Sequence, residues 1–209
     1  MTVTLAHGSM RHKIAGHIDT WSTYIVAVFS RKFEDEKHRT LIAPIVEYGR
    51  GNYDSYLESG EHGQGHSQYL GGGIVFRSRL SNGIFYDGSI RTGRIKPDFE
   101  SVDFSWNGYN VYEKFESNSP YIAAHFGISR EVKTTEKLAL TYYGKFLFSR
   151  TFSDNIYLTS GEDYYLSSVN NSRIKLGVRA GWEVNPKNKF YTGLAYQYEF
   201  DRYCKYSRQ

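Results

Sequence analysis

The chain has 209 residues, which favours a single domain and is an ordinary length for a β-barrel. Hydrophobic residues make up 40%, whereas Tyr, Phe and Trp reach 17% and there are 20 Gly, a composition that suits alternating strands with aromatic ends better than an aliphatic core. The net charge of +4 is spread along the chain, so we expect no nucleic-acid partner. The single Cys204 excludes an internal disulfide, and no apolar run approaches the ~20 residues of a membrane helix.

The N-terminal third contains two predicted strands. Residues Met1–Gly16 are polar and predict a loop or an approach segment, and they lack the basic start and apolar middle of a signal peptide. Weak alternation predicts a strand over Ile18–Phe33, and clearer alternation predicts another over Thr40–Gly51. The stretch Asn52–Ser67 is rich in Gly, Ser and His and predicts a long loop.

The stretch Tyr69–Ile95 predicts a long β-hairpin closed by Ser81-Asn82-Gly83, with Gly83 in the left-handed region. With this loop length, the apolar residues lie on one face of the hairpin and the charged residues on the other. A two-residue loop would mix apolar and charged residues on both faces, so we predict the register that the three-residue loop gives. The predicted cross-strand pairs are Leu80 with Ile84, Arg79 with Phe85, Ser78 with Tyr86, Arg77 with Asp87, Phe76 with Gly88, Val75 with Ser89, Ile74 with Ile90 and Gly73 with Arg91.

The remaining chain continues the same pattern. The segments Lys96–Ser119 and Ser153–Asn171 predict long loops, and Asp201–Gln209 has no clear pattern. Alternation predicts four further strands, over Pro120–Val132, Lys137–Phe152, Arg173–Val184 and Lys189–Phe200.

Connections between these eight segments alternate short and long, as in an up-and-down outer-membrane barrel with tight turns at one end. Several segments run ~12–16 residues, where soluble strands have about 5–6 and membrane strands need ~9–11. The sequence therefore predicts an all-β, antiparallel up-and-down transmembrane β-barrel wall of about eight strands.

Each strand has two chemically different faces, which predicts two different solvents. A lipid-facing set is predicted from the apolar positions: Ile74, Phe76, Tyr86, Ile90, Phe126, Phe146, Val178, Trp182 and Tyr196. A lumen-facing polar set is predicted from the opposite positions: Glu47, Arg77, Asp87, Arg91, Lys145, Arg173, Lys175, Arg179, Glu183 and Glu199. The same charges on the lipid side would cost ~2–4 kcal/mol for each Arg or Lys at mid-bilayer.

No catalytic, cofactor-binding or metal-binding signature is present, so the sequence predicts a protein that is not an enzyme and needs no cofactor. His62 and His66 lie four apart in a predicted loop, where that spacing does not bring them together, and solvated histidines are the simpler interpretation. The Gly71–Gly73 run is followed by no helical pattern, which argues against a phosphate-binding loop.

The order and spacing of several stretches resemble the translocator β-domain of autotransporters, the type V secretion proteins of Gram-negative-type envelopes. The likeness runs from about Gly8 to Asp201. It is carried by Gly8–Asp19, Val46–Tyr56, Tyr69–Arg77, Asn82–Phe99, Tyr142–Phe152, Arg173–Trp182 and Tyr191–Asp201.

The resemblance implies a twelve-strand barrel in the outer membrane that exports or displays an N-terminal passenger and is inserted by the barrel assembly machinery. By the same likeness, the strands predicted here resemble the family's second to ninth, and the chain lacks the family's terminal aromatic, so we expect a partial barrel. The expected organisation is a polar segment over residues 1–16, the barrel domain over 17–203 and an unpatterned tail over 204–209.

Two alternatives remain open at this point. A complete eight-strand outer-membrane protein acting as an anchor or adhesin would also fit the strand count. A soluble β-barrel with a ligand in its mouth would have to account for the long strands and for the arginines on the second face.

Overall fold

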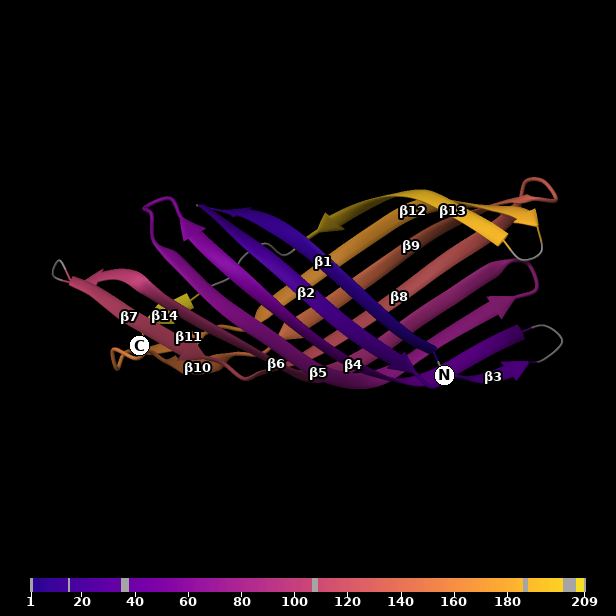
Figure 1. The fold of residues 1–209 in the computed structure, drawn as a ribbon. Coiled ribbons are helices and arrows are strands. Elements are labelled where there is room, and N and C mark those ends of the chain that lie inside the picture. The colour runs from indigo at the N-terminus through magenta and orange to yellow at the C-terminus, as the bar shows by residue number, and fades with distance from the viewer. Residues whose placement is uncertain are drawn as a thin grey trace.

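The computed structural model describes residues 2–14, 16–34, 38–106, 109–185, 188–200 and 206–208. These residues form fourteen strands and no helix, so they contain no helix that could cross a membrane. Most strands belong to one curled sheet, in which they run obliquely side by side (Figure 1). The long strands are β1 (Thr2–Ile14), β2 (Gly16–Val28), β4 (His38–Leu57), β5 (His62–Leu80), β6 (Ile84–Trp106), β8 (Ser119–Lys133), β9 (Leu138–Thr151), β12 (Val169–Asn185) and β13 (Asn188–Glu199).

The main sheet is an antiparallel meander in the order β1-β2-β4-β5-β6-β8-β9-β12-β13. Two shorter strands pair off this path, β3 (Arg31–Glu34) on β4 and β7 (Tyr109–Glu116) on β6. A separate small sheet contains β10 (Asp154–Tyr157), β11 (Asp163–Leu166) and β14 (Tyr206–Arg208). The predicted all-β up-and-down architecture is therefore confirmed, and all eight predicted strands are present.

Seven of the eight cross-strand pairs predicted for the hairpin, from Gly73–Arg91 to Arg79–Phe85, are confirmed. Strands β5 and β6 pair Ile74 with Ile90, Phe76 with Gly88 and Arg77 with Asp87. Gly83 has a φ of 79°, its N–H donates to Leu80 O, and its own carbonyl accepts from Glu131 N at 3.0 Å. The turn therefore needs the conformational freedom of glycine and also links the hairpin to β8.

The expectation of loops beyond the hairpin is wrong at several places. Residues Thr2–Ile14 form β1, paired along its whole length with β2. Asn52–Ser67 contains the ends of β4 and β5 with only a tight turn at about 58–61, and Lys96–Ser119 contains the end of β6 and all of β7. The segment Ser153–Asn171 contains β10 and β11, and the expected unpatterned tail contains β14, whereas Cys204 lies outside the described residues.

These differences share one physical reason. Where polar residues and glycines replace the large apolar residues of a strand, the alternation that predicts a strand fades although the backbone ladder continues. The result is a sheet with two unlike ends (Figure 1). Short connections join β5 to β6 and β8 to β9 at one end, and the hairpin extensions β4–β5, β6–β7 and β10–β11 lie at the other.

Candidate functional site: a curled wall with two unlike faces

The outer face of the wall is apolar and exposed. Of the nine side chains predicted to face lipid, seven are exposed: Ile74, Phe76, Ile90, Phe126, Phe146, Trp182 and Tyr196. The other two, Tyr86 and Val178, are half-buried, and the Tyr86 ring stacks on Phe126 at 6.4 Å. Exposure reaches 59% for Ile74 and 65% for Ile90, far more than an interior position of a globular sheet would show.

The inner face surrounds a cavity of about 760 Å³ to which β1, β2, β4, β5, β6, β8, β9 and β12 contribute lining residues. Five of the predicted polar residues lie in this lining: Arg77, Asp87, Lys145, Lys175 and Arg179. The strand register places them in neighbouring positions, since Arg77 opposes Asp87, and Lys145 opposes Lys175. The curl of the sheet thus brings together charges that lie almost 100 residues apart in the chain.

Asp87 is the centre of one inner-face network. It accepts hydrogen bonds from Lys145 Nζ at 2.7 Å and lies 3.0 Å from His125 Nε2, while His125 Nδ1 lies 2.6 Å from Ser89 Oγ. The order serine, histidine, aspartate resembles a hydrolase triad. Ser89 is only 4% exposed, however, and it does not line the cavity. The geometry therefore serves to brace β6, β8 and β9 against one another.

Glu47 is the centre of a second network nearer the hairpin extensions. It is 4% exposed, accepts from Arg91 Nη1 at 3.0 Å, and accepts from the Tyr121 hydroxyl at 2.6 Å. The Tyr121 ring crosses the strand at Gly71, where a Cβ atom would lie 2.0 Å from the hydroxyl oxygen. A side chain at Gly71 would therefore displace the tyrosine that ties β8 to β4.

Five of the six remaining predicted polar residues have local partners rather than one shared site, and the sixth, Lys175, lines the cavity. Arg77 lies over the Phe85 ring and Arg179 over the Tyr191 ring, at 5.1 and 5.0 Å from the ring centroids. Arg173 Nε donates to Asn171, which in turn donates to Glu199, and Glu183 pairs with Lys189 at 2.9 Å. Sequence analysis did not identify Tyr121, His125 and Ser89 as network members, although all three lie on the same face of the sheet as Glu47 and Asp87.

The outer face changes chemistry at one level along the strands. On β4 the outward residues pass from Val46 and Tyr48 to Arg50, Asn52 and Asp54. On β5 they change in the same way, from Ile74 and Leu70 to Gln68, His66 and Gln64. Ten residues separate Leu70 from Leu80 at the turn, or about 25 Å along the axis at the usual barrel tilt, which matches the apolar band of a membrane barrel.

Comparison with known proteins also indicates a membrane β-barrel. The Autotransporter beta-domain family model matches residues 24–205. The chain belongs to the autotransporter β-domain family. Members of this family are outer-membrane barrels of Gram-negative bacteria that act as translocator or anchor domains, and the wall described above is the wall of such a domain.

Solved structures support the fold of this autotransporter β-domain. The crystal structure of the β domain of the Bordetella autotransporter BrkA superposes with a TM-score of 0.69 at 16% identity, covering 95% of this chain and 78% of that one. The transport unit of the autotransporter AIDA-I from Escherichia coli gives 0.75 at 14% identity, covering 98% and 71%. No similar sequence was found among curated proteins.

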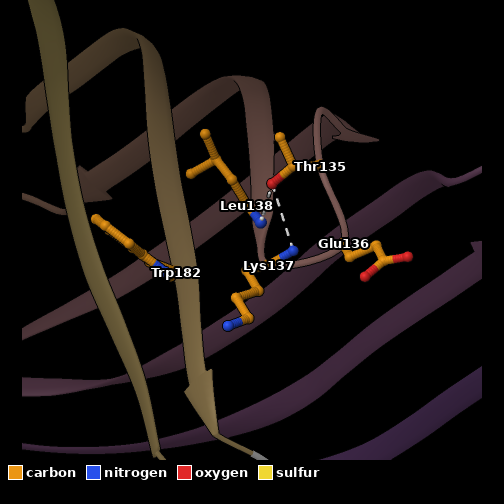
Figure 2. Close-up of a pocket in the computed structure, with 5 residues that line it drawn as sticks. All are labelled: Thr135, Glu136, Lys137, Leu138 and Trp182. Atoms are coloured by element: carbon orange, nitrogen blue, oxygen red, sulfur yellow. Dashed lines mark hydrogen bonds between the residues drawn. The ribbon is translucent and has the colours of Figure 1, made fainter.

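The tight-turn end of the autotransporter wall carries a shallow hollow of about 470 Å³ beside the exposed Trp182 (Figure 2). Thr135 Oγ1 accepts from the backbone N–H groups of Lys137 and Leu138 at 3.3 and 3.0 Å, and Lys137 O accepts from Glu183 N at 2.8 Å. The turn is thus tied to β12, and the hollow is a gap between well-bonded segments.

The extension end carries the histidines that the sequence placed in a loop. His17, Tyr56 and His62 oppose one another across β2, β4 and β5, and their rings are in contact, each pair of centroids being 4.6 Å apart. His66 instead contacts Asp98 at 3.2 Å. Among the described residues, no three His, Cys, Asp or Glu side chains are arranged to hold a metal ion.

Three carboxylates at this end, Asp19, Glu61 and Asp154, have pKa values below their ordinary range. Hydrogen bonds from Arg11 lower the pKa of Asp19, and both Arg11–Asp19 contacts measure 2.6 Å. Burial would raise the pKa of Asp154, but hydrogen bonds from Ser117 Oγ and from the backbone of Asn118 and Asn155 outweigh it and hold the pKa low. These charges are fixed where the sheet meets water.

Proposed function

We propose that this chain forms the outer-membrane wall through which, or on which, an N-terminal passenger is exported or displayed. The observation that carries the proposal is the abrupt change of outward side chains beyond Tyr48 and Leu70, on strands whose ladder continues unbroken. A change of side chains without a change of backbone fits a change of solvent, from hydrocarbon to water.

The two faces take complementary roles in this proposal. The nine outward residues from Ile74 to Tyr196 contact lipid tails, because their exposed apolar surface would be unfavourable in water. The ten inward residues from Glu47 to Glu199 keep the lumen hydrated and brace the wall through the Asp87 and Glu47 networks. The role is one of passage and anchoring and requires no catalytic group from this chain.

Three partners follow from this role: outer-membrane lipid, the barrel assembly machinery and a passenger segment. The extensions β4–β5, β6–β7 and β10–β11 would stand on the outer side, and the short turns at 81–83 and 134–137 on the periplasmic side. That orientation places Asp19 and Asp154 in water on the cell surface.

The test is to express the full chain with a signal peptide and a protease-sensitive reporter fused before Thr2. We expect the protein in the outer-membrane fraction, with a gel mobility that changes on heating, and with the reporter cleaved by external protease in intact cells. A folded monomer in the soluble fraction would overturn the membrane assignment. A membrane-inserted barrel whose reporter stays protected would overturn passenger export and leave an anchor.

A further inference from the structure

Three cations form a cluster on the outer face where the apolar band ends. Arg50 on β4, Gln68 on β5 and Lys96 on β6 occupy one row across three adjacent strands. Arg94 lies one outward position nearer the band, directly opposite Leu70. All four side chains are exposed. This cluster of Arg50, Gln68, Arg94 and Lys96 is called the basic row below.

The spacing of the basic row suits a small multivalent anion. Adjacent strands lie about 4.8 Å apart, so the Cα atoms of Arg50 and Lys96 are about 10 Å apart across Gln68. Arg94 and Lys96 are two residues apart on one face, or about 6.6 Å. Three flexible cationic side chains and one amide donor can therefore meet on a single phosphate-sized group above Gln68.

The cations of the basic row have not been neutralised by their neighbours. Within the described part of the chain, none of Arg50, Arg94 and Lys96 is in an ion pair. Asp98, two residues from Lys96 on β6, bonds elsewhere: it accepts from His66 N at 2.5 Å and lies 3.2 Å from His66 Nδ1. Asp154 accepts from Ser117 Oγ and Asn118 N. Arg94 contributes only a weaker, longer-range attraction to Asp154. Three positive charges thus remain available to an external anion.

The position of the basic row at the edge of the apolar band indicates which kind of anion it binds. The basic row begins at the level of Leu70 and directly above Tyr48, the outward aromatic that ends the apolar band on β4. If the outward apolar residues contact lipid tails, then the basic row lies at the level of the headgroups, and its partner is a lipid phosphate rather than a solute. Arginine and lysine at this depth interact favourably with anionic headgroups.

We propose that the basic row is a binding site for a phosphate-bearing lipid headgroup of the leaflet that surrounds the extension end. The lipid would place its acyl chains along the exposed Leu70 and Ile74 and its phosphate among Arg50, Arg94 and Lys96. Such a contact would fix the depth of β4, β5 and β6 in the membrane. The inference rests on the proposed function, since a soluble sheet has no headgroup level.

The test uses the full chain folded in neutral detergent, with heat-dependent gel mobility as proof of a folded barrel. Retention of a diphosphorylated glucosamine lipid is measured by native mass spectrometry for wild type and for the triple variant Arg50→Gln, Arg94→Gln, Lys96→Gln. We expect the triple variant to bind at least about tenfold more weakly. The dephosphorylated form of the same lipid should bind wild type equally weakly.

The matched control removes three exposed cations from the opposite end, by Arg130→Gln, Lys133→Gln and Lys137→Gln, and changes the net charge by the same amount. This control should bind like wild type. Equal binding by both variants, or displacement of the lipid by an equal concentration of inorganic phosphate, would overturn the lipid site. A chain that never forms a heat-modifiable barrel would instead overturn the proposed membrane function on which the site depends.

Discussion

The wall and its hairpin extensions are made of the same strands but are stabilised differently. In the wall, β4 alternates strictly between buried Ala43, Ile45 and Glu47 and outward apolar side chains. In the extensions, polar residues occupy the outer face. Cohesion there, and at the same end of the β1–β2 hairpin, comes from ring contacts such as Phe99–Phe115 at 5.5 Å and from ion pairs such as Arg11–Asp19. In the proposed orientation, a continuous β-ladder therefore crosses a boundary between solvents, and its side chains change at that boundary.

The inner face is stabilised by different contacts in the wall and in the extensions. Wall charges such as Glu47 and Asp87 reach across two or more strands and hold the curl of the sheet. In the extensions, the inner face is filled by aromatic rings over glycines, as where Phe99 lies over Gly63. The wall thus depends on a few buried polar contacts, whereas the extensions depend on many contacts that are individually weak.

The largest expected effect comes from a charge on the outer face of the wall. Phe146→Arg places a guanidinium near the middle of the apolar band and should lower the free energy of unfolding by about 2–4 kcal/mol. The matched change Gln64→Arg, on the outer face of the extension, should stay within about 0.5 kcal/mol. Urea unfolding from lipid vesicles measures both. Equal effects at the two positions would show that the two regions face the same solvent.

The second expected effect tests the buried contacts of the inner face. Glu47→Leu leaves the Arg91 guanidinium and the Tyr121 hydroxyl without their shared acceptor. Loss of one partner of a buried pair costs ~3–5 kcal/mol, and we expect about 2–3 here because the Arg91 side chain is 30% exposed. Glu47→Gln keeps an acceptor oxygen and should cost less. The exposed Arg11→Gln should leave global unfolding unchanged, and a large loss there would contradict the contrast between wall and extension.

A third effect tests the close contact at Gly71. Gly71→Val should cost about 1–3 kcal/mol, since the new side chain would displace the Tyr121 ring and its Cβ would meet Thr92 O at 2.9 Å. Gly8→Val on β1, where a Cβ meets nothing within 4 Å, is the control and should be nearly neutral. Thermal loss of the fast-migrating gel band reports both variants, and equal midpoints would exclude the proposed role of Tyr121 as a brace.

The same contrast explains how much of the molecule the sequence predicts. In the wall, the need to keep Arg77 and Asp87 on one face and Ile74 and Ile90 on the other left a single register, and that register is correct. In the extensions, Asn52–Ser67 and Lys96–Ser119 carry polar residues on the outer face and few large aliphatic residues on the inner face, so their strands leave little apolar alternation to detect.

The hydrogen-bond networks around Glu47 and Asp87 were harder to predict than the face of the sheet on which each residue lies. Alternation places Tyr121 and His125 on the polar side, but their partners Glu47 and Asp87 lie 74 and 38 residues away. Which residues meet depends on the curl of the whole sheet, and period-two patterning carries no information on curvature. The fold and sidedness could therefore be predicted from sequence, whereas the braces could not.

The smallest expected effect is a local change with pH in the extension at Asp154. Because its pKa is lowered in the folded state, Asp154 stabilises the β10–β11 hairpin above the carboxyl's ordinary pKa, and that contribution is lost as pH falls through the lower, folded value. Protonation weakens the Asp154 carboxylate as an acceptor for the N–H groups of Asn118 and Asn155. Amide hydrogen exchange at these two positions, normalised for its intrinsic pH dependence, should lose protection below about pH 4, while amides of β5 in the wall stay protected.

The control variant Asp154→Asn should show weaker protection of the same two amides, with no pH dependence. Exchange that changes at the same pH in wall and extension would mean that acid acts on the whole sheet, and that the extension has no separate stability.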